Sequence, residues 1–214
     1  MNGGYLQVGR WGGAPVRLHW TLPLGALVLG HGRFAPGHWL GFVLIVLIHE
    51  IGHAFVVRRQ GHRVVSIEVH ALGGLCRWAG DVTAIQRARI AWGGVQAQLV
   101  ALVIAAGATR VLGPPPPRFT ADLASAFIYT NLCLVAINLI PVPPLDGAEA
   151  WKLPGLLRAR SRARRSRVKT DATQSAAREL ARLDAREGAL PADTAAAVDA
   201  RLRELAGGTD KKRG

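Results

Sequence analysis

The chain has 214 residues, half of them hydrophobic, and a formal net charge of +13. This length allows one domain or two small ones and is enough for a sizeable core. The apolar content excludes a disordered chain, and two cysteines are too few for a disulfide scaffold. The charge is uneven, because residues 151–214 carry 16 basic and 8 acidic residues, whereas residues 1–150 carry 11 and 6.

The first apolar stretch, Leu18–Gly30, is short and is interrupted by Pro23 and Gly25. Because Arg10 and Arg17 precede it, this stretch is either the core of a signal peptide or a retained membrane helix. No small-x-small cleavage site follows it, which favours the retained helix.

Three longer stretches carry almost no charge. They are His38–Val57, whose only formal charge is Glu50, Ile90–Thr109 and Leu123–Leu145. A helix rises about 1.5 Å per residue, so about 20 residues cross a hydrocarbon core of about 30 Å. The sequence therefore predicts an integral membrane protein of the membrane α-helical class, with about four transmembrane helices.

Arginine-rich and arginine-poor loops alternate along the chain, and cytoplasmic loops are the ones that carry excess Arg and Lys. This alternation predicts that both termini are cytoplasmic. Cys76 then lies on the cytoplasmic side and Cys133 within a span, so we expect two free thiols.

The segment Val64–Trp78, between the second and third long spans, has the pattern of a strand pair. Apolar and polar residues alternate from Val65 to Ala71, and Gly73-Gly74 can form a two-residue turn. We expect a small β-hairpin at the cytoplasmic face; an irregular loop is the alternative.

Two histidines and a glutamate lie together in His49-Glu50-Ile51-Gly52-His53. Residues i and i+4 of a helix share a face, so His49 and His53 can offer imidazole nitrogens to one metal ion. Glu50 can reach a metal-bound water from the adjacent position. The alternative is a pair of core histidines beside a stray acid. That alternative is weakened because an ionisable group at the bilayer centre costs at least about 2.5 kcal/mol.

A catalytic zinc site has three protein ligands and one open position, and the candidate third ligand is Asp146. It lies in the segment Asn138–Gly147, whose three prolines must end the preceding helix. Irregular backbone at membrane depth is tolerated only where protein buries it or where it lines a water-filled cavity. Hydrolysis of a peptide bond inside a bilayer requires such a cavity.

Together these two motifs resemble the site-2 protease family of intramembrane zinc metalloproteases. The family pairs H-E-x-x-H on one helix with N-x-x-P-x-P-x-L-D-G on a later one, and the resemblance covers about residues 5–150. It implies one bound Zn²⁺ and an α-helical membrane fold. The residues implied are the zinc ligands His49, His53 and Asp146, the general base Glu50, and Asn138 as a hydrogen-bonding partner of substrate or oxyanion.

The resemblance also implies hydrolysis within or near a transmembrane segment of another membrane protein, as in regulated intramembrane proteolysis. The substrate must unwind locally, and the strand Val64–Leu72 is a candidate to receive it as an added strand. The chain departs from the family where Val95 and Gln98 replace a Pro and an Asn that members often have. A catalytically silent membrane scaffold, a metal-binding protein of the same fold and a zinc transporter remain alternatives.

We expect a transmembrane metalloprotease domain over residues 1–154, and a basic juxtamembrane segment with a cytoplasmic helical hairpin over residues 155–214. Seven basic residues in Arg158–Lys169 suit anionic lipid headgroups or act as a topology anchor. No nucleic acid is expected, because aromatic interleaving and a recognisable binding module are lacking. Two helices, Asp171–Glu187 and Ala192–Ala206, separated at Gly188, suit self-association or a partner. The excess of Arg over Lys suggests a bacterial source, and therefore the inner membrane.

Overall fold

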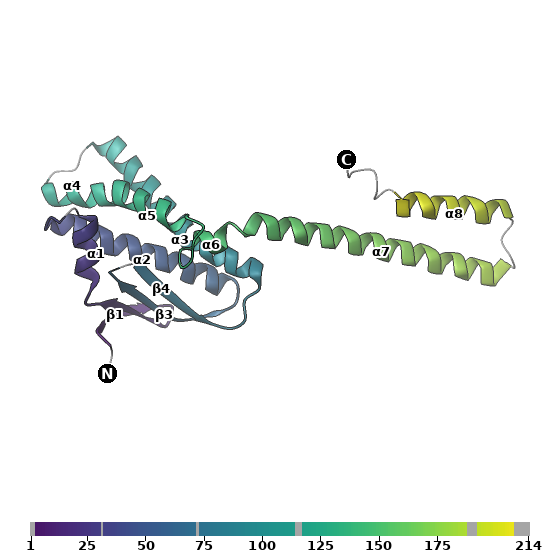
Figure 1. Ribbon diagram of the computed structural model, residues 1–214, viewed down its shortest axis with the longest axis horizontal. Coiled ribbons are helices and arrows are strands. Elements are labelled where there is room, and N and C mark those ends of the chain that lie inside the picture. The colour runs from purple at the N-terminus through teal and green to yellow at the C-terminus, as the bar shows by residue number, and fades with distance from the viewer. Residues whose placement is uncertain (1–2, 31, 72, 114–116, 188–191, 208–214) are drawn as a thin grey trace. The chain divides into compact units, whose positions relative to one another are not determined.

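A computed structural model of the protein describes residues 3–30, 32–71, 73–113, 117–187 and 192–207 (Figure 1). The chain forms two compact units, Met1–Leu156 and Leu157–Gly214. The first unit contains a small sheet and the membrane helices, and the described residues of the second unit are helical. Each unit is described by itself.

A four-stranded sheet lies in the first unit, in the order β1 (Tyr5–Trp11), β2 (Ala14–His19), β3 (Arg63–His70) and β4 (Gly73–Ala79). Strands β1 and β2 are antiparallel, β2 and β3 parallel, and β3 and β4 antiparallel. The predicted hairpin is therefore present as β3 and β4. Strands β1 and β2 were not predicted.

Two details of the sheet correct the sequence analysis. Gly73 and Gly74 are not the turn, because they pair with His70 and Val69 inside β4. Ala71 is a turn residue, and the residue that follows it, Leu72, lies outside the described residues. The stretch expected to begin the first membrane helix at Leu18 instead belongs to β2, where Leu18 pairs with Val69 of β3.

The first apolar stretch forms only the short helix α1 (Leu22–Leu29), and eight residues span about 12 Å. The prediction of a membrane helix over Leu18–Gly30 is therefore wrong in the described structure. Among the described residues, three helical segments are long and apolar enough to cross a membrane. They are α2 (Pro36–Arg59), α3 (Ala84–Leu112) and the continuous segment Arg118–Asn138, which consists of α4 (Arg118–Ser125), a π-helical turn η1 (Ala126–Thr130) and α5 (Asn131–Asn138).

Local sequence explains where these helices begin and end. Helix α3 begins at a capping box in which the Thr83 hydroxyl accepts from the Gln86 N–H and the Gln86 side chain accepts from the Thr83 N–H. Helix α5 ends at Asn138, three residues before Pro141, as the proline-rich segment predicted. The short helix α6 (Gly147–Ala150) follows the proline-rich segment.

Helix α2 is the centre of the first unit, and the sheet and the helices α4 and α5 lie on different sides of it (Figure 1). Ile67 of β3 packs with Ala54 and Val57 of α2, in a core that is closed to solvent. On the α3 side the contact is so close that a Cβ atom on Gly93 would lie 2.7 Å from the carbonyl oxygen of Gly52. The polar residues of α2 are therefore held among packed elements.

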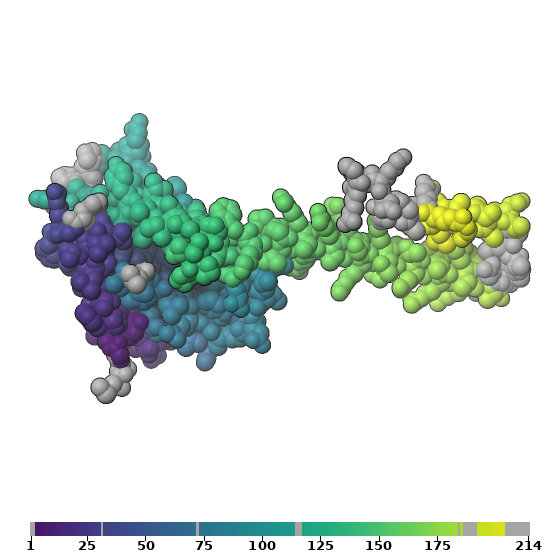
Figure 2. Space-filling view, viewed as in Figure 1, coloured from purple at the N-terminus to yellow at the C-terminus, as the bar shows by residue number. Residues whose placement is uncertain are grey.

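The second unit contains the greater part of the 35-residue helix α7 (Leu153–Glu187), followed by α8 (Ala192–Gly207). The predicted helix Asp171–Glu187 is only the second half of α7, because helix also covers the basic segment Arg158–Lys169. Arg, Ala and Leu favour helix, which accounts for this extension. Every side chain from Leu157 to Glu179 is exposed. Figure 2 shows one face of this helix. The predicted break at Gly188 lies outside the described residues.

Candidate metal centre

The two histidines of the second span lie one turn apart on α2 and face the same point. Both residues are only 7% exposed. The Nε2 atom of His49 lies 3.0 Å from the Nε2 atom of His53. Their rings meet edge to face, with centroids 4.5 Å apart. The i, i+4 spacing has therefore produced the juxtaposition that it predicted.

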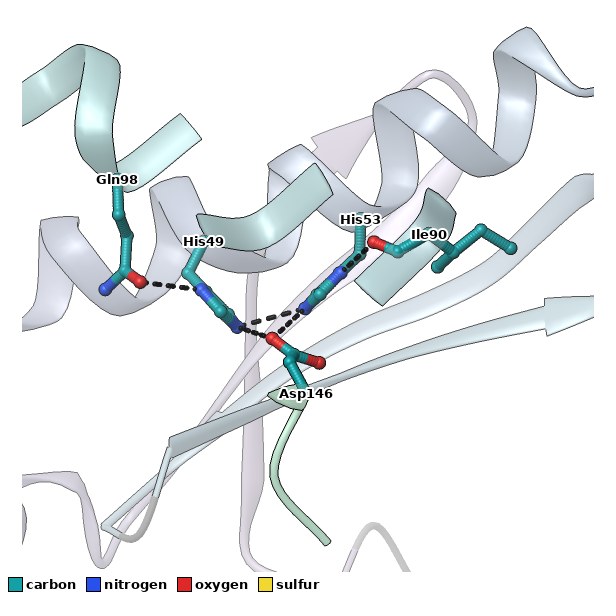
Figure 3. A network of polar contacts seen from close by, with 5 residues as sticks. All are labelled: His49, His53, Ile90, Gln98 and Asp146. Carbon is teal, nitrogen blue, oxygen red and sulfur yellow. Dashed lines mark hydrogen bonds and ion pairs between the residues drawn. The ribbon is translucent and has the colours of Figure 1, made fainter. Parts of the chain in front are cut away.

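Helix α3 fixes the orientation of both rings (Figure 3). His49 Nδ1 lies 2.9 Å from Gln98 Oε1, and His53 Nδ1 lies 2.7 Å from the carbonyl oxygen of Ile90. A carbonyl oxygen only accepts hydrogen bonds, so each Nδ1 must carry the proton that is donated. In the neutral rings each Nε2 atom therefore has no proton and keeps its lone pair, and this is the form that binds a metal ion.

Asp146 brings a third acceptor to the same point from the segment between α5 and α6. Its Oδ2 atom lies 2.9 Å from His49 Nε2 and 3.2 Å from His53 Nε2. This oxygen is buried, and no donor is aligned on it as in a hydrogen bond. Two ligands of a tetrahedral zinc ion lie about 3.3 Å apart, given bonds of about 2.0–2.1 Å. The three donor atoms therefore fit one small cation.

The charge of Asp146 suits such a cation. Burial acts to raise the pKa of this carboxyl group, but hydrogen bonding and charge attraction from His49 and His53, when these rings carry a second proton, are stronger and lower the pKa below the ordinary value. The group is therefore a carboxylate at neutral pH.

A glycine on α3 provides the space for the two rings. A Cβ atom on Gly94 would lie 2.6 Å from His49 Cε1 and 2.6 Å from His53 Nε2. Contacts this short require an atom to move, so only glycine lets α3 approach the metal-binding pair this closely.

Glu50 lies beside the three donor atoms, between α2 and the sheet. It is 3% exposed, and its carboxylate accepts a hydrogen bond from the backbone of Cys76 in β4. A Cβ atom on Gly74 would lie 2.5 Å from Glu50 Oε1, so the strand passes directly over this carboxylate. Burial, together with the charge of Glu50, raises the pKa of the Cys76 thiol to about 12. Cys76 is therefore an uncharged thiol, so Glu50, and not Cys76, is the acidic group next to His49 and His53.

A cavity of about 580 Å³ contains these groups. His49, Glu50, His53 and Asp146 line it, and Asn138 at the end of α5 lines it as well. The structure thus brings together in one cavity all five residues that the sequence singled out. Their roles as metal ligands, base and substrate contact remain predictions.

The sequence analysis did not find the groups that orient these residues. Gln98 was noted only as a departure from the family pattern. The Ile90 carbonyl has no signature in a sequence, because every residue carries the same backbone group. Gly94 was not singled out as a site residue, because its contact with the histidines depends on how α2 and α3 cross.

Comparison with known proteins relates this site to characterised sequences and folds. No model of a known protein family matches the chain. The chain is 30% identical over 154 residues to the "Putative zinc metalloprotease Rip3" of Mycobacterium tuberculosis, with 69% of this chain and 36% of that protein covered. It is 31% identical over 166 residues to the "Putative zinc metalloprotease sll0528" of Synechocystis, with 69% and 43% covered. The chain therefore spans about two fifths of the length of these curated relatives.

The fold comparison agrees. The site-2 protease from Methanocaldococcus jannaschii superposes with a TM-score of 0.52, at 22% identity, over 69% of this chain and 70% of that one. The chain belongs to the site-2 protease family. The resemblance inferred from the two motifs is thereby confirmed, and membership together with the three apolar helices makes the chain a membrane protein. Both curated relatives carry the name "Putative zinc metalloprotease".

Proposed function

We propose that this chain is an intramembrane zinc endopeptidase that hydrolyses peptide bonds within or near transmembrane segments of other membrane proteins. The observation that carries this proposal is the convergence of two imidazole Nε2 atoms and the Asp146 Oδ2 atom beside the buried Glu50. The donor set, two histidines and one carboxylate, is typical of a catalytic zinc site with one open position.

Each residue has a part that follows from its position. His49, His53 and Asp146 hold the ion, which, when bound, supplies a Lewis acid and an activated water. The Glu50 carboxylate accepts a proton from the attacking water and returns it to the nitrogen of the leaving amine. Its hydrogen bond with the Cys76 backbone keeps it pointed into the cavity. Asn138, on the cavity wall, hydrogen-bonds the substrate backbone or the oxyanion.

The strand expected to receive the substrate has to be corrected. The segment Val64–Leu72 cannot accept an added strand, because β3 already pairs with β2 on one side and β4 on the other. Strand β4 pairs only with β3 in the described sheet, so its second edge is free. Gly74 and Leu75 of β4 line the cavity. We therefore assign substrate binding to the free edge of β4, which positions an extended peptide next to Glu50.

The test compares membrane-protein fragments from cells that express the wild type, Glu50→Gln or Glu179→Gln at matched levels. Glu179 is an exposed acid of α7 and serves as the matched control. New termini inside transmembrane segments should appear with the wild type and Glu179→Gln, and should fall about 10²- to 10⁴-fold with Glu50→Gln.

The zinc content of each variant shows whether a loss of cleavage comes from the missing base or from a missing metal ion. Glu50→Gln should keep the zinc of the wild type, because Glu50 is not one of the proposed ligands. Equal fragment profiles in zinc-loaded wild type and Glu50→Gln would favour a catalytically silent scaffold. Zinc flux across vesicles, retained in Glu50→Gln, would favour a transporter.

We also propose that the helix α7 contacts anionic lipid headgroups through Arg158–Lys169, in a bacterial inner membrane with both termini cytoplasmic. The segment holds seven basic residues and no acid, and all of it is exposed. Full-length protein in anionic nanodiscs should lose this segment to trypsin more slowly than in zwitterionic ones, and salt should remove the difference. Equal rates would leave the basic segment as a topology anchor.

A further inference from the structure

Two tryptophans bind the ends of the segment that carries Asp146. The indole N–H of Trp151 donates to the carbonyl oxygen of Leu139 at 2.7 Å. The indole N–H of Trp92 on α3 donates to the carbonyl oxygen of Ala150 at 2.9 Å. The two rings meet edge to face, with centroids 5.7 Å apart. The segment is therefore closed upon itself and attached to α3 at the same place.

This segment needs external support, because little of it is regular. Between Leu139 and Ala150 the only helix is the four-residue α6, and the remainder is turn and bend. Val142 is 54% exposed, so packing does not fix that side of the segment. Next to Asp146, Gly147 folds back against the carbonyl groups of Leu139 and Ile140. The Trp151 hydrogen bond closes the loop at this fold.

The hydrogen bond of Trp92 is one of three by which α3 holds the parts of the metal site. The helix holds His53 through the carbonyl oxygen of Ile90 and His49 through the side chain of Gln98. Through Trp92 it also holds the segment of Asp146. Helix α3 carries none of the three donor residues, yet one hydrogen bond from it reaches each imidazole and the segment that carries the carboxylate.

We propose that Trp92 and Trp151 are positioning residues that keep the Asp146 carboxylate within bonding distance of the metal. This inference rests on the metal site of the proposed function. Without the two indole N–H groups, the Leu139 and Ala150 carbonyls lose their donors and the segment gains freedom. Asp146 must then be ordered when the ion binds, which weakens binding.

The test measures zinc affinity of the full-length protein in detergent by competition with a chelator. Trp92→Phe and Trp151→Phe remove the N–H but keep an aromatic ring, and each should weaken zinc binding about 10- to 100-fold. Trp39→Phe is the matched control, because the Trp39 indole also donates to a backbone carbonyl, that of Arg33, at 3.1 Å. It should leave zinc affinity unchanged.

A double-mutant cycle separates positioning from general destabilisation. In an Asp146→Ala background, Trp92→Phe should cost little further zinc affinity, because the residue through which it acts is already gone. Excess zinc should restore the metal content of Trp92→Phe, and the visible spectrum of the cobalt(II)-loaded form should differ from that of the wild type.

Three results would overturn the proposal. They are unchanged zinc affinity in both tryptophan variants, an equal loss in Trp39→Phe, and full additivity with Asp146→Ala. If the wild-type protein cleaves no substrate, yet the two tryptophan variants still lose zinc, the positioning role holds and the proposed protease activity fails. If the wild type binds no zinc, both proposals fail together.

Discussion

The two halves of α3 differ both in composition and in their surroundings. From Ala88 to Gln98 most residues are buried, and Gly93, Gly94 and Gln98 lie against α2. From Leu99 to Leu112 no residue is buried, and Val103 and Ile104 are 70% and 66% exposed. Large apolar side chains are thus placed where nothing in the described chain covers them.

The difference shows how a membrane protein distributes its side chains. Lipid is as apolar as leucine, so large apolar residues give no reason for helices to associate. Association and function instead use small residues for close approach and polar residues for hydrogen bonds. In α3 the region Gly93–Gln98 contains both kinds of residue, and we expect the outer half, Leu99–Leu112, to contact lipid.

A charge in the outer half gives the largest expected effect. Val103→Arg should impair membrane insertion by about 2.5–3.5 kcal/mol, because Val103 lies near the middle of an uncharged stretch. Leu112→Arg, at the helix end and 84% exposed, should be tolerated, since its side chain can reach the interface. Carbonate-resistant membrane fractions measure both. Normal insertion of Val103→Arg would mean that the outer half does not contact lipid.

The inner half of α3, Ala88–Gln98, lies next to the buried thiol of Cys76, whose reactivity reports how far that thiol is shielded from reagents in solvent. The Cys76 pKa is raised to about 12, so at pH 8 its thiolate is scarce and its alkylation should be at least about 100-fold slower than in the denatured chain. The raised pKa favours the folded state below pH 9, and this contribution is lost as the pH rises through about 12. Mass spectrometry of maleimide-treated protein measures the rate. Equal alkylation rates in native and denatured protein would show that the Cys76 thiol is not shielded in the folded state.

Substitutions of two glycines of α3, one in each half, compare the two halves directly. Gly94→Ala should weaken zinc binding about 10- to 100-fold, because the new methyl group would displace His49 and His53. Gly107→Ala meets no atom within 4 Å and should raise helix stability by about 0.5–1 kcal/mol. Metal content and thermal unfolding distinguish the two effects. Equal changes in metal content and thermal stability in the two variants would contradict the distinction between the halves.

The smallest expected effect comes from a polar contact to the inner half. Asn131 is fully buried, and its amide donates to the backbone carbonyl of Gln98 at 2.9 Å. Asn131→Leu should lower stability by about 0.6 kcal/mol, the average for such bonds in membranes. Leu132→Val, at a neighbouring exposed position, should change stability less. Unfolding in mixed micelles measures both, and a larger loss in Leu132→Val would contradict this ranking.

The local features of this fold could be predicted from the sequence. Length and hydropathy located the three long spans, the H-E-x-x-H spacing placed two imidazoles on one face, and the prolines ended the last span. Alternation found β3 and β4. Each of these predictions depends on residues close together in the chain.

Features that depend on distant contacts were not predicted. Strand β2 escaped notice because its end merges with the apolar stretch Leu18–Gly30 and its partner β3 lies about 50 residues later. The orientation of the histidines depends on a carbonyl group and an amide of α3, which only the crossing of α2 and α3 brings into position. The loop closure by Trp151 likewise has no local sequence signal.

The backbone contact between Gly52 and Gly93 has a mechanical consequence. Where two helices touch through side chains, a rotamer change lets them separate slightly; where they touch through backbone atoms, no such adjustment exists. Helices α2 and α3 should therefore move as one rigid body. Admission of a substrate chain then falls to an element that meets this pair from outside, such as β4, so the gate is separate from the two helices that carry and orient the imidazoles.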